Sequence, residues 1–118
     1  MSDCIFCMIA DGKMSAKVVY EDDEIIAFDD IMPQAPIHTL VVPKEHYDSL
    51  SDGVPEELLG RLMAKVPEIA ETKGISETGY RVIINTGRDA AQSVGHLHVH
   101  VLGGRMMSHG MVNFDNED

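Results

Sequence analysis

Apolar positions recur along the chain with two different periods, which distinguishes one long helix from several strands. Between Pro55 and Thr72 they return every three or four residues, which predicts an amphipathic helix with one apolar stripe. Pro55 suits the first turn of this helix, whereas Pro67 removes an internal hydrogen bond and is expected to kink or loosen it. The stripe consists of Leu58, Leu62, Val66 and Ile69.

Shorter segments rich in Val, Ile and aromatic residues predict strands. The first two flank acidic residues 21–23 and are expected to form a hairpin, and Pro36 and Pro43 bound the third. A short helix is expected from Asp3 to Ala10. The expected strands span residues 17–20, 24–28, 37–42, 80–85 and 97–102. The pattern predicts an α+β fold, with about five antiparallel strands, one long helix packed on the sheet and a short N-terminal helix.

Composition and charge narrow the possible ligands. With 118 residues, of which 44% are hydrophobic, we expect a single domain spanning residues 1–118. The 9 Lys and Arg residues against 20 Asp and Glu residues give a formal net charge of −11, which repels nucleic acids and anionic membranes. A phosphate ligand must therefore be small and held by local donors. Neither a secretory signal nor a membrane span is visible, and we expect a cytoplasmic protein.

Three histidines, His96, His98 and His100, alternate with apolar residues near the end of the chain. In a strand all three would share one face, which must look into a cleft or solvent. A single metal held by all three is disfavoured, because alternate Cα atoms lie roughly 6.6 Å apart and zinc needs each nitrogen within roughly 2.1 Å. Imidazoles at fixed spacing suit phosphoryl transfer, as nucleophile and as hydrogen-bond donors. The alternative is a polar strand face without a function.

Cys4 and Cys7 have a spacing found both in zinc sites and in redox motifs. A redox motif normally follows a strand, and no strand is expected before Cys4. Two cysteines so close together also argue against a disulfide scaffold. Two interpretations remain, namely a metal site that needs two further ligands and a pair of reduced buried thiols.

The stretch from Gln92 to Arg105 resembles the signature of the histidine triad family, and in particular its nucleotide-binding branch of purine nucleoside phosphoramidases. The segments Cys4–Cys7, Ala27–His38 and Val82–Gly87 agree with the same family, so the resemblance covers nearly the whole chain. It implies the histidine triad fold, a variant of the α+β fold expected above.

The resemblance implies that His98 attacks the α-phosphorus of a nucleotidyl compound and forms a nucleotidyl-histidine, which water then hydrolyses. A main-chain carbonyl near His96 would hold its other ring nitrogen. Further residues take implied roles in the same site. His100 and His38 would stabilise charge on the phosphate, Ser93 would hydrogen-bond the leaving group or a phosphate oxygen, Asn85 would face the phosphate, Asp30 would bind the ribose, and Phe6, Ile9, Phe28 and Ile31 would line a slot for the base.

In some bacterial members of the family, the paired cysteines bind zinc together with two histidines. By resemblance these would be His46 and His96, giving a closed structural zinc site with Cys4 and Cys7. The family also implies a homodimer and a purine nucleotide ligand such as AMP or GMP.

The chain departs from the family in its tail after Arg105, which lacks Trp and Pro, and in the acidic pair Asp29-Asp30, where a neutral or basic residue is common at one position. The leading hypothesis is a hydrolase of purine nucleoside phosphoramidates. The alternatives are a dinucleoside polyphosphate hydrolase, a nucleotide-binding or scaffold protein with residual activity, and a metal-binding regulator. A serine hydrolase is disfavoured because no Gly-x-Ser-x-Gly motif surrounds Ser93.

Overall fold

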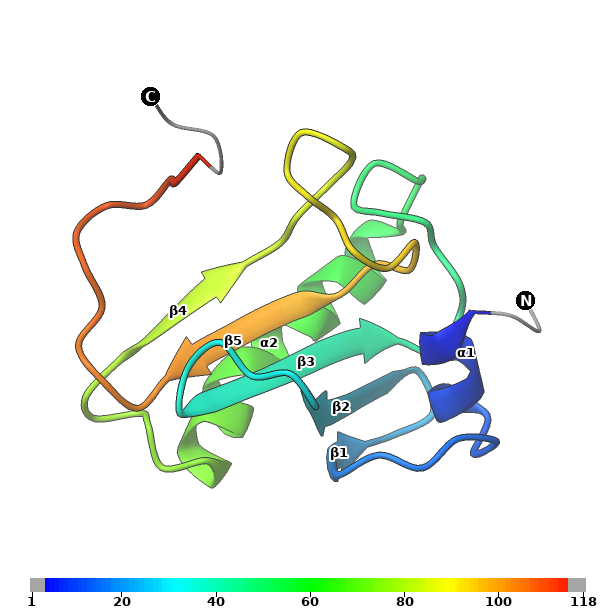
Figure 1. The fold of residues 1–118 in the computed structure, drawn as a ribbon. Coiled ribbons are helices and arrows are strands. Elements are labelled where there is room, and N and C mark those ends of the chain that lie inside the picture. The colour runs from blue at the N-terminus through cyan, green and yellow to red at the C-terminus, as the bar shows by residue number, and fades with distance from the viewer. Residues whose placement is uncertain (1–3, 115–118) are drawn as a thin grey trace.

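The computed structural model describes residues 4–114, which contain one five-stranded antiparallel sheet and two helices (Figure 1). The strands are β1 (Val18–Glu21), β2 (Ile25–Asp29), β3 (Ile37–Pro43), β4 (Tyr80–Ile83) and β5 (Val99–Gly103), in the spatial order β1-β2-β3-β5-β4. The expected hairpin pairs β1 with β2, and β3 pairs with both β2 and β5. The predicted α+β class is therefore confirmed.

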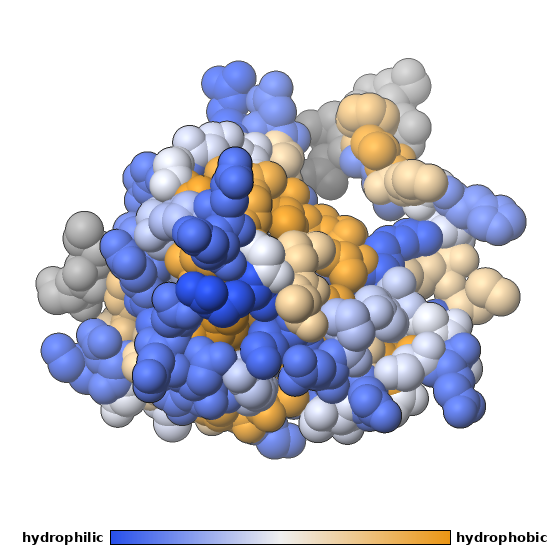
Figure 2. All heavy atoms as spheres, turned by 180° about the vertical axis from the view of Figure 1, so that it is seen from behind, coloured by the Kyte–Doolittle hydropathy of each residue, from blue (hydrophilic) through white to orange (hydrophobic). Residues whose placement is uncertain are grey.

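The long helix α2 (Glu56–Thr72) covers one face of the sheet, and the short helix α1 (Ile5–Ala10) lies beside the opposite face. The apolar stripe of α2 is buried as predicted, and the helix continues across Pro67. On this side of the molecule Figure 2 shows a hydrophobic patch flanked by hydrophilic regions. Within residues 4–114, no helix is both long and apolar enough to cross a membrane.

Alternation along the strands gives each face of the sheet its own core. On β2, Ile25 and Ala27 pack under α2, whereas Ile26 and Phe28 pack on the side of α1. Burying each of the larger side chains contributes about 1.5–3 kcal/mol to folding. In the same way, Val99 and Val101 of β5 lie under α2. The histidines that alternate with these valines are thereby placed on the face away from α2.

Three predicted boundaries differ from the structure by two residues, and the others by at most one. The strand expected from Leu97 begins at Val99, because the Leu97 N–H donates to the Tyr47 carbonyl in a loop (2.7 Å) rather than to a neighbouring strand. The strand expected to reach Asn85 ends at Ile83. Helix α1 begins at Ile5 with Cys4 as its N-cap, and Asp3 lies outside the described residues.

Candidate functional site

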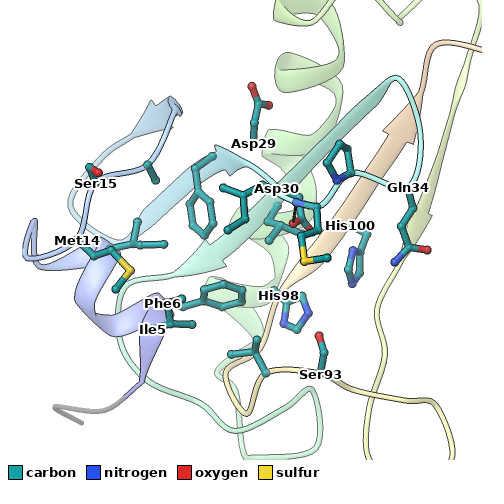
Figure 3. A pocket seen from close by; sticks show the side chains of 18 residues that line it. Ile5, Phe6, Met14, Ser15, Asp29, Asp30, Gln34, Ser93, His98 and His100 are labelled. Atoms are coloured by element: carbon teal, nitrogen blue, oxygen red, sulfur yellow. Dashed lines mark hydrogen bonds between the residues drawn. The ribbon is translucent and has the colours of Figure 1, made fainter.

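A cavity of about 650 Å³ opens on the face of the sheet opposite α2. In Figure 3 it lies between α1, which carries Phe6, and the segment that carries His98 and His100. Phe6 meets Phe28 edge to face, with ring centroids 5.4 Å apart, so aromatic faces form part of its wall. The four residues expected to hold a base all line it: Phe6, Ile9, Phe28 and Ile31.

His98 is buried in the wall of this cavity, and one ring nitrogen is fixed by the backbone. Its Nδ1 lies 2.7 Å from the carbonyl oxygen of His96. A carbonyl can only accept, so the Nδ1 carries the proton and the Nε2 of a neutral ring carries a free lone pair. Phe6 also packs edge to face on this ring, at 5.1 Å between centroids. The bond to a main-chain carbonyl near His96 is therefore present as expected.

A second chain of hydrogen bonds sets the protons on His38 and His100. The Gln34 N–H donates to Nδ1 of His38 (3.0 Å), so the proton of a neutral His38 ring lies on Nε2. That Nε2 is 2.9 Å from Nδ1 of His100 and donates to it, which leaves the His100 proton on its own Nε2. Within residues 4–114, this buried Nε2 has no hydrogen-bond partner. Unpaired buried donors of this kind are typical of sites where a ligand supplies the acceptor.

Burial keeps both of these rings neutral. It lowers the pKa of His100 to about 4, with nearby His98 and His38 lowering it further and the Asp30 carboxylate opposing them. Burial also lowers the pKa of His38, against the opposing effect of Asp30. Neutral rings are what the hydrogen-bond chain from Gln34 requires, so geometry and electrostatics agree.

The two neighbouring acids Asp29 and Asp30 point in different directions (Figure 3). The Asp29 carboxylate accepts from the Thr39 hydroxyl (2.9 Å) and pairs with Lys73 at the end of α2 (2.9 Å). Asp30 lines the cavity, where its carboxylate accepts from the Met32 N–H (2.9 Å) and lies 3.6 Å from His38. Both acids border the cavity, but the Asp29 carboxylate is engaged by Thr39 and Lys73, where it ties the sheet to α2. Among residues 4–114, Asp30 has no such cationic partner and is the acid better placed to meet a ligand.

Ser93 and Asn85 lie at different cavities. Ser93 lines the large one, with its hydroxyl on the side of His98 (Figure 3). Asn85 lines a smaller neighbouring cavity of about 70 Å³ instead. Gln34 and His100 border both cavities, whereas Asn85 borders only the smaller one.

Cys4, Cys7, His46 and His96 converge in a separate cluster, with ligand atoms all within 4.8 Å of one another. The Nδ1 of His96 lies 3.3 Å from the Cys4 sulfur and 3.5 Å from the Cys7 sulfur. The Nδ1 of His46 lies 3.2 Å from the Cys7 sulfur. A tetrahedral zinc ion with ordinary bond lengths separates sulfur and nitrogen ligands by roughly 3.6 Å. The cluster therefore has nearly the dimensions of a zinc site.

The outer partners of both histidines direct a lone pair into this cluster. The Nε2 of His96 donates to the Pro43 carbonyl (2.8 Å), and the Nε2 of His46 bonds the Asp48 carboxylate (2.8 Å). Each Nδ1 is then free to bind a metal, as metal-bound histidines usually are. Without a metal, burial and the neighbouring Cys4 raise the pKa of the Cys7 thiol to about 11. Two thiols and two imidazoles are a donor set that zinc prefers.

A second group, Asp30, His38 and His100, also brings its ligand atoms within 4.8 Å. Its hydrogen bonds argue against a metal, however, because the ring-nitrogen lone pairs of His38 and His100 already accept hydrogen bonds. Nδ1 of His38 accepts from Gln34, and its Nε2–H donates to His100. These side chains are arranged as a relay of hydrogen bonds rather than as a metal site.

A family model for the HIT domain matches residues 11–107. Protein HitA of Neisseria gonorrhoeae is 50% identical over 105 residues, which cover 87% of this chain and 97% of that protein. The chain belongs to the HIT domain family.

Solved structures of relatives share the fold of this HIT-domain protein. A HIT family hydrolase from Legionella pneumophila is 44% identical, with a TM-score of 0.86, and the match covers 90% of this chain and 96% of that one. A histidine triad nucleotide-binding protein from Candida albicans is 30% identical, with a TM-score of 0.79, and the match covers 96% and 88%.

The sequence missed several residues around the cavity of this HIT-domain protein. Gln34 stands in a segment that resembles the family, but only the structure shows its N–H fixing the His38 ring. Met14, Ser15 and Met32 also line the cavity from loops. Loop residues carry no periodic signal, so the pattern of apolar positions could not have found them.

Proposed function

We propose that this HIT-domain protein hydrolyses purine nucleoside phosphoramidates through a covalent nucleotidyl intermediate on His98. The observation that carries the proposal is the bond from His98 Nδ1–H to the His96 carbonyl, which leaves Nε2 as a nucleophile at the cavity wall. The relative from Legionella pneumophila is described as a hydrolase and that from Candida albicans as nucleotide-binding. Both descriptions agree with this chemistry.

In the first step, Nε2 of His98 forms a bond to the phosphorus, and the phosphorus–nitrogen bond of the substrate breaks. The leaving nitrogen takes a proton from solvent water in the open cavity and departs as the neutral amine, with the Ser93 hydroxyl hydrogen-bonding it. The His98 ring gains positive charge, which its bond to the His96 carbonyl stabilises. In the second step, water attacks the phosphorus and the bond from phosphorus to Nε2 breaks. The nucleoside monophosphate is released, the proton of the attacking water returns to solvent, and the His98 ring is neutral again.

His100 stabilises the phosphate as a neutral donor. Its Nε2–H is the unpaired donor at the end of the relay from Gln34 and His38, and a phosphate oxygen is a suitable acceptor for it. A neutral ring with a pKa of about 4 keeps this proton throughout the physiological range. Preorganised donors of this kind are a large source of rate enhancement.

The rest of the cavity suits a nucleoside. Phe6, Ile9, Phe28 and Ile31 offer an apolar slot for a purine base such as that of AMP or GMP. The Asp30 carboxylate can accept from both ribose hydroxyls. Because the chain has a net charge of −11, a small ligand with local donors is favoured over a nucleic acid.

We also propose that Cys4, Cys7, His46 and His96 bind a structural zinc ion. The donor set and the lone-pair directions fit zinc, and all four ligand positions are filled by side chains, as in closed structural sites. A bound ion would join α1, and with it Phe6, to the segment before β5. The proposed location is the cytoplasm, where reduced thiols of this kind are usual.

A homodimer is part of the proposal. Strand β4 lies at one edge of the sheet, where its outer backbone groups can pair with a second copy. Apolar side chains also gather on the α2 face (Figure 2), including half-buried Leu59 and Val82 and the partly exposed Met63. The mass of the protein in solution, measured by light scattering, tests this part.

The test of the function compares wild type with His98→Ala on an adenosine phosphoramidate, with His109→Ala as control. His109 is an exposed histidine of the tail. Losing the nucleophile should lower kcat/KM roughly a thousandfold or more, while the control keeps the wild-type rate. Equal rates in wild type and His98→Ala contradict the proposal. Faster turnover of a dinucleoside polyphosphate would favour that alternative, and tight AMP binding without turnover would favour a binding protein.

A further inference from the structure

One side chain, Gln92, holds the loop between β4 and β5 in place. Its Oε1 accepts from the Gly87 N–H (2.9 Å), and its Nε2 donates to the carbonyls of Val94 (2.9 Å) and Asp48 (2.7 Å). Both ends of the amide are thus engaged. Two of these bonds close the loop on itself, and the third joins it to the segment after β3, which lies beside it in Figure 1.

The loop also contains a strained residue. Ala91 has a φ of 58°, a left-handed conformation that disfavours every residue except glycine and, to a lesser degree, Asn and Asp. The turn that holds it is closed by the Ala91 N–H to the Arg88 carbonyl (2.9 Å) and by the Gln92 N–H to the Gly87 carbonyl (3.1 Å). Such a conformation persists only where its surroundings hold it, and Gln92 supplies most of the bonds that do so.

The segment that Gln92 contacts carries an outer partner of the metal cluster. Asp48 bonds Nε2 of His46 through its carboxylate (2.8 Å) and accepts from Gln92 through its main-chain oxygen. A second contact joins the same two segments, because the Leu97 N–H donates to the Tyr47 carbonyl (2.7 Å). The cluster histidines themselves, His46 and His96, meet edge to face with ring centroids 4.8 Å apart.

We propose that Gln92 is a positioning residue, which links metal binding at His46 and His96 to the placement of Ser93 in the active site. The inference rests on the proposed function for the role of Ser93 and for the metal. A metal held by both histidines fixes the two segments relative to each other. The bond from Gln92 to Asp48 passes that constraint to the loop, and Ser93 is the next residue along the chain.

A merely structural role would have a different consequence. If Gln92 only supported the fold, its loss would loosen the loop equally in the metal-loaded and metal-free protein. If Gln92 links the two sites, its loss abolishes the difference between these two states. The difference between them is therefore the quantity to measure.

The experiment measures hydrogen exchange of the peptide covering residues 86–95 by mass spectrometry, in zinc-loaded and chelated protein. In wild type, chelation should accelerate exchange of this loop by about tenfold. In Gln92→Met the loop should exchange fast in both states. Gln34→Met is the matched control, because Gln34 bonds His38 through its backbone N–H and not through its side chain. This variant should keep the wild-type difference in loop exchange between zinc-loaded and chelated protein.

Kinetics and metal affinity give independent readouts. In Gln92→Met, kcat on a phosphoramidate should fall about tenfold with KM within about twofold, because Ser93 acts on the departing group in the transition state. Zinc affinity should weaken roughly threefold to tenfold, less than the loss of a direct partner of a metal ligand costs. Gln92→Glu keeps the side-chain acceptor for the Gly87 N–H but loses both donated bonds, so it should behave like Gln92→Met. Unchanged hydrogen exchange in β3 and β5 verifies that both variants fold.

The proposal is overturned if Gln92→Met keeps the zinc-dependent difference in loop exchange. It is also overturned if wild type takes up no zinc, or if chelation leaves the wild-type loop unchanged. A wild-type protein without turnover on any phosphoramidate contradicts the proposed function, and the exchange difference still decides whether Gln92 links the two sites.

Discussion

Replacing Phe6 with alanine tests whether α1 is anchored by one aromatic side chain. Phe6 is only 6% exposed, and its ring packs edge to face on Phe28, His98 and His96 at centroid distances of 5.4, 5.1 and 5.9 Å. Buried Phe→Ala changes cost about 3–5 kcal/mol. Phe6 borders the open cavity, so part of the vacated space fills with water, and alanine's higher helix propensity returns about 0.5 kcal/mol. We therefore expect a loss of about 3 kcal/mol in the free energy of unfolding.

The assay is urea unfolding of Phe6→Ala and of Ile5→Ala, in zinc-loaded and in chelated protein. Ile5 stands on the same helix but is 37% exposed, so its truncation should cost less than about 1 kcal/mol. Phe6→Ala should also raise KM for a phosphoramidate about fivefold, because the base loses one aromatic wall. A loss below about 1 kcal/mol for Phe6→Ala, or equal losses in the two variants, would show that α1 is not anchored as described.

Two further predictions follow from the charges of the site and from the metal cluster. The pKa of His100 is lowered from 6.5 to about 4, so between these values the unfolded chain binds more protons than the folded one. The contribution of His100 to stability is therefore complete above pH 6.5 and is lost as the pH falls toward 4. Over this range the free energy of unfolding should decline less steeply in chelated His100→Gln than in chelated wild type. Parallel slopes for the two proteins would contradict the lowered pKa of His100. Cys7→Ser should lose most of its bound zinc, as measured by elemental analysis of protein purified without chelator. The melting temperature of this variant should no longer respond to chelation. Full zinc occupancy in Cys7→Ser would rule out the proposed ligand set.

The sequence predicted the parts of the fold that periodicity controls. The stripe on α2 and the alternation of histidines with valines at β5 are properties of side-chain spacing, so the sequence predicted them. The start of β5 could not, because it depends on the bond from Leu97 to Tyr47, which lie far apart in the chain. The same limit applies to the relay from Gln34 to His100 and to the role of Gln92, since each depends on a contact between separate segments.

For the candidate site, residue types carried part of the information. Alternating histidines placed His98 and His100 on one face, and resemblance to the family placed Asp30 near them. Residue type and periodicity could not distinguish Asp29 from Asp30, because the distinction depends on Lys73 at the end of α2 and Thr39 of β3, which bind the Asp29 carboxylate and not that of Asp30. Their separate functions follow from tertiary contacts.

The most direct test of the central claim is to mix the protein with an adenosine phosphoramidate, quench within the first turnover and map the modified residue by mass spectrometry. A free Nε2 on His98 predicts a nucleotidyl group on His98 that accumulates and then decays at the rate of steady-state turnover. A nucleotidyl group on Ser93 or on another histidine, or turnover without any covalent intermediate, would contradict the account.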